Sequence, residues 1–355
     1  MRKIKVLFYH FGIVQDKNAQ SLISREIALR LDPTKFDCTF FYRGTADPRL
    51  VSAGHITLKW IPPRGGSIFM GYHLILGKFD ILVYPPVGKM LDLYSSLVSV
   101  FGREKKIIKS FEMVSESSQT YSKADIALIT DASFCYAISP FIAESVKQTL
   151  GIEVSVLPLG VDSSRFHFVN RPQNSKPVQI IDVATIQSRK QTHVVLDLAN
   201  KIGADLAEFH IVGDLIGPVE YRDELLRRKT DEGLNHVHFH GKVVHAELPK
   251  WLNRSDILIL PSRLEGLPKI TLEAAATGLP CVIFDDYRTP SVVDGVTGFQ
   301  VNTFDQFYSR LVLLIENPNL RQEMGRAATA HVQQFDWDNV IEQYEEMLLD
   351  VDAHD

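Results

Sequence analysis

The sequence predicts an α/β protein made of two doubly wound, Rossmann-like domains that face a cleft. Short apolar strands alternate with helical patterns along the chain, as is typical of parallel sheets with crossover helices. The 355 residues suffice for two domains, and 45% hydrophobic residues can fill two cores. A polar stretch with two prolines, residues 169–177, is the best linker candidate.

The first half of the chain supplies five strand patterns. They lie at residues 5–9, 37–42, 81–84, 106–109 and 154–157. Between the first two strands, residues 19–31 predict a helix, with Leu22, Ile23, Ile27 and Leu31 on one face. We therefore expect an N-terminal domain over residues 1–168.

The second half repeats the alternation after the linker. Its six strand patterns lie at residues 179–184, 208–212, 236–240, 256–260, 281–284 and 298–301. A C-terminal domain over 178–335 follows, with a final helix over 336–355 that we expect to cross back to the first domain. Ligands of such sheets bind outside the carboxyl ends of the strands, which points both domains toward a cleft.

Composition excludes several classes of protein. The net charge of −5 implies no broad basic face for nucleic acid. Cys38, Cys135 and Cys281 show no metal spacing and are expected to be free thiols of a cytoplasmic protein. The N-terminus enters a strand directly, unlike a signal peptide, and no apolar run reaches the roughly 20 residues of a membrane span. Residues 68–76 favour a core segment, with contact to a membrane surface as the alternative.

Residues 258–273 predict a nucleotide site, because an apolar strand runs into a loop and then a helix start. Gly266 allows close backbone approach, and Pro268 suits the first helical position. The N–H groups of residues 269–272 would then point out of the helix end toward an anion such as a diphosphate. Glu265 lies at the mouth of this site, and Glu273, two turns into the helix, can accept hydrogen bonds from ribose hydroxyls.

Glu265 and Glu273 bracket seven residues, and this stretch resembles the E-x7-E motif of the family 4 retaining glycosyltransferases, a glycogen-synthase-like group with the GT-B fold. Residues 273–282 are similar to that family's EAMAxGxPVV run, and residues 294–299 to its DGxTGxL turn. Residues 158–162, 211–214, 237–241, 254–257 and 335–337 match further short motifs in the expected order. The resemblance covers the second domain well and the first mainly by pattern.

The resemblance implies a retaining glycosyltransferase that moves a sugar from a nucleotide-diphosphate sugar to an acceptor hydroxyl, without a metal or other cofactor. The acceptor would be a sugar, a lipid-linked sugar or a small molecule, in the synthesis of a surface polysaccharide, glycolipid or other glycoconjugate. Peripheral association with the inner face of the membrane is compatible with such acceptors, and the oligomeric state is left open.

The resemblance also assigns residues. Lys190 falls on the family's diphosphate-binding Lys, and Glu265 and Glu273 on its sugar-binding and ribose-binding glutamates; Lys190 and Glu265 are the catalytic candidates. The donor-binding candidates are Gly12, Arg189, Gly266, Leu267, Pro268, Lys269, Ile270, Thr271, Leu272 and Glu273.

Several positions depart from the family pattern. Thr185 replaces its usual Arg, and Arg189 or Lys269 are the candidates to supply the lost charge. The first loop has only Gly12 where two glycines are usual. Glu112 is the acceptor-side candidate at the place of a usual His, and residues 290–293 lack a carboxylate.

Two patterns resemble metal sites. His236, His238 and His240 alternate on a predicted strand, but no further ligand set completes the site, so we expect no metal there. Residues 336–338 spell D-x-D, yet they begin a C-terminal helix, so Asp336 is predicted to be an N-cap.

Two rival functions stay open. One is a non-catalytic nucleotide-sugar-binding subunit, which Thr185 and the absent acceptor His would favour. The other is a GT-B nucleotide-sugar epimerase, whose chemistry requires an acid/base pair near the sugar.

Overall fold

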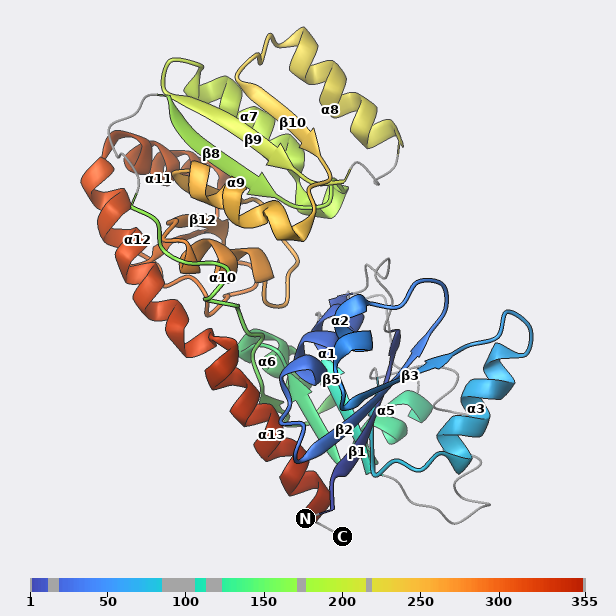
Figure 1. The fold of residues 1–355 in the computed structure, drawn as a ribbon. Coiled ribbons are helices and arrows are strands. Elements are labelled where there is room, and N and C mark those ends of the chain that lie inside the picture. Colours follow the sequence, from blue (N-terminus) through green and yellow to red (C-terminus); the bar gives the residue numbers. More distant parts are fainter. Residues whose placement is uncertain are drawn as a thin grey trace. The chain divides into compact units, whose positions relative to one another are not determined.

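The computed structural model describes residues 2–11, 19–84, 106–112, 123–170, 177–214 and 219–353. It divides the chain into two compact units (Figure 1). Unit 1 consists of Met1–Leu159 with Asp338–Asp355, and unit 2 of Gly160–Trp337. Each unit has one parallel sheet, which confirms the predicted α/β class with two Rossmann-like domains.

Unit 1 contains a seven-stranded sheet in the order β3-β2-β1-β4-β5-β6-β7. Its strands are β1 (Ile4–Phe11), β2 (Phe36–Tyr42), β3 (Ile56–Trp60), β4 (Ile81–Tyr84), β5 (Lys106–Phe111), β6 (Phe134–Ala137) and β7 (Ser155–Val156). Its helices are α1 (Ala19–Arg30), α2 (Pro48–Ser52), α3 (Gly66–Leu76), α5 (Lys123–Thr130), α6 (Pro140–Leu150) and α13 (Trp337–Ala353), the last of which starts one residue before the boundary.

The five strands predicted in this half are confirmed, whereas β3 and β6 escaped the prediction. Both are short, and β3 is an edge strand with no fully buried residue, so its apolar signal is weak. The helix predicted at 19–31 is α1, with Ile23, Ile27 and Leu31 buried. The expectation for Leu22 is wrong, since it is 41% exposed.

Helix α13 joins unit 1 through specific contacts. The Glu345 carboxylate accepts hydrogen bonds from the Asp32 N–H at 2.6 Å and from Lys35 Nζ at 2.8 Å. The buried Tyr344 hydroxyl donates to the carbonyl oxygens of Leu157 and Pro158, each at 3.2 Å. These bonds tie the end of the chain to segments of unit 1 that are distant in sequence.

The boundary between the units precedes the predicted linker at residues 169–177. The segment from Gly160 onward already belongs to unit 2, where Gly160 lies against the Trp337 ring so closely that a Cβ would meet it at 2.2 Å. Residues 171–176, most of the predicted linker, lie outside the described residues.

Unit 2 contains a six-stranded sheet in the order β10-β9-β8-β11-β12-β13. The strands are β8 (Val178–Val183), β9 (Ala207–Val212), β10 (Val237–Gly241), β11 (Ile257–Leu260), β12 (Cys281–Phe284) and β13 (Gly298–Val301). Each corresponds to one of the six predicted strands. The helices are η1 (Ser188–Lys190), α7 (Thr192–Ile202), α8 (Val219–Asp231), η2 (His245–Glu247), α9 (Leu248–Arg254), α10 (Lys269–Ala276), α11 (Phe304–Glu316), α12 (Pro318–Val332) and η3 (Gln333–Phe335).

The strand order of unit 2 reverses between β8 and β11. From β8 the chain first adds β9 and β10 on one side, and then returns to add β11 on the other. The carboxyl ends of β8 and β11 therefore mark the switch point of the sheet, which is where parallel sheets bind ligands. Gly213, after β9, allows the chain to pass close to Ala184 at the end of β8, because a Cβ at residue 213 would meet the Ala184 carbonyl oxygen at 1.7 Å.

Cys38, Cys135 and Cys281 are free cysteines, as expected. Of the helices in the described part of the chain, none combines the length and the apolarity needed to span a bilayer.

Candidate functional site: a charged cluster at the switch point of unit 2

The carboxyl ends of β8 and β11 bring two distant loops together. These strands are parallel neighbours, with Ile180 paired to Ile257. The loop after β8 carries Arg189 and Lys190 in η1, and the loop after β11 carries Ser262 and Glu265. Because parallel strands end at the same edge of a sheet, these side chains share the crevice at the switch point.

Glu265 is the centre of this cluster. One oxygen, Oε1, accepts hydrogen bonds from Ser262 Oγ at 2.5 Å, from Arg189 Nη1 at 3.4 Å and, through a very short contact, from Lys190 Nζ. The Lys190 and Glu265 side chains are only 16% and 11% exposed, so solvent screens their attraction weakly. An ammonium group has three donors, so Lys190 can hold Glu265 and still offer a donor to an anion.

Arg189 and Arg263 have different partners. Arg189 Nη1 also donates to the Leu264 carbonyl oxygen at 2.5 Å, which holds the guanidinium beside Lys190. Arg263 instead pairs with Asp286 at 2.9 Å and covers the Phe284 ring. The cluster therefore has two adjacent cations, Arg189 and Lys190. Arg189 is thus placed to supply the positive charge that is missing at Thr185.

Asp182 is a member of this region that the sequence analysis did not select. It is fully buried near the end of β8, and neither carboxylate oxygen has a hydrogen-bond partner in the described structure. Burial raises its pKa to about 7; the charge of Lys190 acts to lower it and that of Glu265 to raise it further. The sequence did contain a signal for Asp182, because burying an Asp inside an otherwise apolar strand costs free energy.

The helix start that follows Glu265 differs in detail from the prediction. Pro268 is the N-cap residue rather than the first helical residue, and α10 begins at Lys269. The Thr271 N–H donates to the Pro268 carbonyl oxygen at 3.1 Å, which removes it from the amides expected to face an anion. Gly266, Leu267, Pro268 and Leu272 are buried, so their contribution to a ligand would come from the backbone.

Glu273 lies in α10 and is 3% exposed. It follows Lys269 by four residues, about one helical turn rather than the two predicted, and the Lys269 ammonium is 4.0 Å from its carboxylate. His245 Nε2 lies 2.8 Å from Glu273 Oε1 and fixes its orientation. The sequence analysis missed His245, because a single His in a loop after a strand carries no distinguishing pattern.

Of the two candidate site residues in unit 1, only Glu112 lies within the described residues. Gly12 lies outside the described residues. Glu112 follows β5 and is buried; burial raises its pKa to about 8, opposed by a hydrogen bond from the Ser110 hydroxyl at 3.4 Å. Its acceptor-side role stays a prediction.

The alternating histidines do not form one group. His238 and His240 stack on His210 of β9, with ring centroids 5.3 and 5.2 Å away, whereas His236 Nε2 contacts the Ala199 carbonyl oxygen of α7 at 3.0 Å. Burial and the two neighbouring histidines lower the pKa of His210 to about 4. Within the described residues, no group of three or more His, Cys, Asp or Glu side chains could hold a metal ion.

Asp336 precedes α13 with an extended backbone, and its carboxylate accepts a hydrogen bond from the Ser163 N–H at 3.2 Å. This bond ties residue 336 to the start of unit 2. The described contacts give the D-x-D carboxylates no cluster resembling a metal site.

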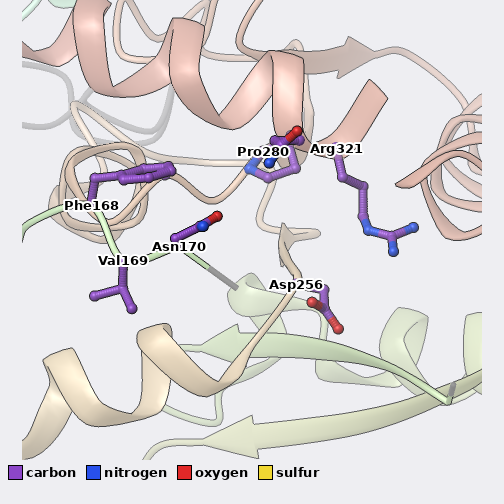
Figure 2. A pocket seen from close by; sticks show the side chains of 8 residues that line it. Phe168, Val169, Asn170, Asp256, Pro280 and Arg321 are labelled. Atoms are coloured by element: carbon purple, nitrogen blue, oxygen red, sulfur yellow. The ribbon is translucent and has the colours of Figure 1, made fainter. Parts of the chain in front are cut away.

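A separate small pocket of unit 2 lies at the other edge of the sheet (Figure 2). Asp256 and Pro280 in its wall immediately precede β11 and β12, so the pocket is at the amino ends of the strands. It is lined by Phe168, Val169, Asn170, Asp256, Gly278, Pro280, Arg321 and Gln322. Asp256 accepts the Gln179 N–H at 2.8 Å, and Arg321 donates to the Leu314 carbonyl oxygen at 2.6 Å. These bonds serve the packing of the sheet.

Two parallel α/β units, the second with a charged cluster at its switch point, define a GT-B protein. Solved structures agree over the whole chain. A glycosyltransferase from Rickettsia africae superposes with a TM-score of 0.83 at 15% identity and full coverage of both chains. Anabaena Alr3699/HepE in complex with UDP gives a TM-score of 0.79 at 18% identity, covering 98% of this chain and 100% of that one.

Sequence comparison adds a family match. Residues 163–331, just under half of the chain, match the family model for glycosyl transferases group 1. A D-inositol 3-phosphate glycosyltransferase of Arthrobacter sp. is 30% identical over 187 residues, which are 50% of this chain and 41% of the relative. A GDP-mannose-dependent mannosyltransferase of Corynebacterium glutamicum, acting on a monoacylated phosphatidylinositol monomannoside, is 30% identical over 144 residues, 38% of each chain. The chain thus spans less than half the length of these curated relatives.

Proposed function

We propose that the protein is a retaining glycosyltransferase that takes a sugar from a nucleotide-diphosphate sugar and transfers it to an acceptor hydroxyl. The observation that carries the proposal is the cluster of Arg189, Lys190 and Glu265 at the switch point of unit 2. The helix that begins just after this cluster, α10, carries Glu273. A diphosphate needs cations, a ribose needs a hydrogen-bond acceptor, and the same crevice offers both.

In this proposal Lys190 and the first amides of α10 hold the donor diphosphate. Arg189 supplies the charge that the family places at position 185, because its guanidinium already lies beside Lys190 on Glu265. Glu273, held by His245, accepts hydrogen bonds from the ribose, and Glu265 contacts the sugar ring.

The proposed reaction is the one that the family resemblance implies. The bond between the anomeric carbon and the diphosphate oxygen breaks, and the acceptor oxygen forms a new bond to that carbon from the same face. The acceptor proton goes to the departing phosphate oxygen. Lys190 and Arg189 stabilise the negative charge that develops on the diphosphate, which is usually the largest contribution to such catalysis. No metal is required, because these cations and the helix-end amides offset the same charge.

A non-catalytic nucleotide-sugar-binding subunit is the second candidate function, and Thr185 in place of the usual Arg favours it. It would hold the donor in the same crevice and neither transfer nor hydrolyse the sugar. The epimerase alternative has less support, because no acid/base pair beside Glu265 has been identified for it.

The test starts with a thermal-shift panel of UDP, GDP and ADP and their sugar derivatives. A ligand at 100 times its Kd stabilises a protein by about 2.7 kcal/mol, which such a panel detects. The stabilising nucleotide sugar is then incubated with the protein alone. Slow release of free sugar supports the enzyme, whereas stabilisation without any turnover, with and without sugar or lipid-linked acceptors, supports the binding subunit.

The predictions on the acceptor and on the cellular location are parts of this proposal. The acceptor is a sugar, a lipid-linked sugar or a small molecule, and the protein acts in the cytoplasm. Association with the membrane depends on a different part of the chain, α3 of unit 1, and is independent of the nucleotide site.

A further inference from the structure

Helix α3 of unit 1 is apolar on two opposite sides. Toward the sheet, Leu74 is buried, and Phe69 and Met70 pack against the core cluster that contains it. Toward solvent, Ile68, Tyr72 and Leu76 are 80%, 58% and 52% exposed. The expectation that residues 68–76 form a core segment is therefore right for one side of the helix only.

The three exposed residues form a single stripe, which we call the outer face of α3. Ile68, Tyr72 and Leu76 follow one another at four-residue spacing, so their side chains stack along one side of the helix. Figure 1 shows α3 at the periphery of unit 1, and its inner side packs against residues of β1, β2 and β4. Trp60, at the end of β3, adds a further large apolar side chain that is 50% exposed.

The chain segment that contains α3 carries no acidic side chain. Between Asp47 and Asp80 the sequence contains no Asp or Glu, although the whole chain carries a net charge of −5. Arg64 and Lys78, which flank α3 in the sequence, are exposed, and the described residues provide neither with an ion-pair partner. An apolar stripe between unpaired cations on an otherwise acidic protein is complementary to an anionic, partly apolar surface.

We propose that the outer face of α3 binds an anionic phospholipid membrane. Ile68 and Leu76 enter the boundary between headgroups and acyl chains, and Tyr72 lies at headgroup level, where aromatic rings with a polar end are favoured. Arg64 and Lys78 contact the lipid phosphates of the negatively charged surface.

The geometry separates this partner from the alternatives. Eleven residues make a helix of about 16 Å, half the thickness of a bilayer core, so α3 lies along the surface and does not span it. A second copy of the chain, joined by two-fold symmetry through this face, would bring Arg64 and Lys78 of one copy toward those of the other and repel it. An anionic lipid surface satisfies the apolar stripe and the cations together.

Membrane binding through α3 stands without the glycosyltransferase proposal. If the glycosyltransferase proposal also holds, membrane binding favours a lipid-linked acceptor, because the protein would work on the surface that carries such an acceptor. This last step rests on the proposed function, and the binding measurement below does not.

The experiment is sedimentation of the full-length protein with vesicles of phosphatidylcholine alone and of phosphatidylcholine with phosphatidylglycerol. The wild type should bind the anionic vesicles, and added salt should weaken this binding. The combined variant Ile68→Ser, Tyr72→Ser, Leu76→Ser should lose at least roughly tenfold in partition, and Arg64→Gln with Lys78→Gln a similar amount. Val219→Ser with Val244→Ser, which removes equally exposed apolar side chains from unit 2, is the matched control and should bind like wild type.

A urea unfolding curve of each variant shows that unit 1, which carries α3, is still folded. Stabilisation by UDP, measured on each variant, separates a failure here from a failure of the nucleotide site. Equal binding to neutral and anionic vesicles, or wild-type binding by the serine variant, would overturn the proposal. So would self-association of the wild type that the serine substitutions abolish, because the face would then join two copies of the chain.

Discussion

Unit 1 and unit 2 share one architecture but differ in how strongly the sequence specifies it. Every strand of unit 2 matches a predicted strand, and the family model lies within this unit at residues 163–331. Unit 1 has two strands that escaped prediction, and its likeness to known proteins rests on the fold. The difference teaches that long apolar strands separated by clear turns can be predicted from the sequence, whereas a half-exposed edge strand such as β3 cannot.

The buried carboxyl groups of the two units extend this comparison. Asp182 of unit 2 and Glu112 of unit 1 both lie at the carboxyl end of a sheet strand, and burial raises the pKa of both. Asp182 has Lys190 as a charged neighbour, whereas Glu112 has only the Ser110 hydroxyl as a hydrogen-bond partner that lowers its pKa. Asp182 lies beside charged side chains, whereas the charge of Glu112 acts on the buried hydroxyls of Tyr136 and Tyr344, whose pKa it raises.

The largest effect is expected from Glu265→Gln. Transfer should fall by roughly 100-fold or more, the range for loss of a preorganised electrostatic contact. UDP affinity should stay nearly intact, because Glu265 is assigned to the sugar ring, which UDP lacks. Turnover and calorimetric UDP binding check this.

Glu273→Gln is the matched control in the same helix–loop segment. Its loss should appear in UDP affinity, since Glu273 is assigned to the ribose. If both variants lose UDP affinity equally, the division of labour between the two glutamates is wrong.

Asp182→Asn should change how stability depends on pH. Asp182 has a folded pKa of about 7 against an ordinary value of 3.8, so its stabilising, protonated form is fully present below about pH 4 and is lost as pH rises through 7. The wild type should therefore lose a few kcal/mol, at most about 4, between these limits, and Asp182→Asn should lose less. Urea unfolding at about pH 5 and about pH 8 measures the free energy of unfolding of both proteins. If this free energy changes equally with pH in wild type and Asp182→Asn, Asp182 does not titrate in this range.

Glu112→Gln makes the corresponding test in unit 1. Its folded pKa of about 8 lies above the ordinary 4.5, so the stability it contributes below pH 4.5 is lost as pH rises through 8. Replacement should remove that loss and leave UDP affinity unchanged, because Glu112 lies outside unit 2. Unfolding curves and UDP calorimetry on the same preparation check both statements. A changed UDP affinity would give Glu112 a part in donor binding and weaken the distinction between the two acids.

Metal removal is expected to have the smallest effect. Transfer should stay within about twofold in excess chelator, since cations of the protein offset the diphosphate charge. Asp338→Asn should be equally mild, and Asp336→Ala should cost roughly 1 kcal/mol of stability from the lost hydrogen bond with the Ser163 N–H. Activity that chelator abolishes and manganese or magnesium restores would place the phosphate site elsewhere.

The sequence predicted the parallel sheets and the loop from Glu265 to Glu273, because strand periodicity and a helix start are local signals. It could not predict that Lys190 touches Glu265, since 75 residues separate them and only the pairing of β8 with β11 brings them together. The contact of His245 with Glu273 is likewise tertiary. The sequence left open whether residues 68–76 form a core segment or contact a membrane surface, because an apolar helix in a sequence does not show which of its sides the sheet covers.

The most direct test of the account is calorimetric titration of UDP into wild type, Lys190→Ala and Lys229→Ala. Lys229 lies on α8, and no ion pair is found for it in the described structure, so it serves as the matched control. Lys190→Ala should weaken UDP binding by roughly 1.5–3 kcal/mol, the range of a charge-assisted hydrogen bond, while Lys229→Ala binds like wild type. UDP affinity that is unchanged in Lys190→Ala would contradict the central claim that the switch point of unit 2 is the diphosphate site.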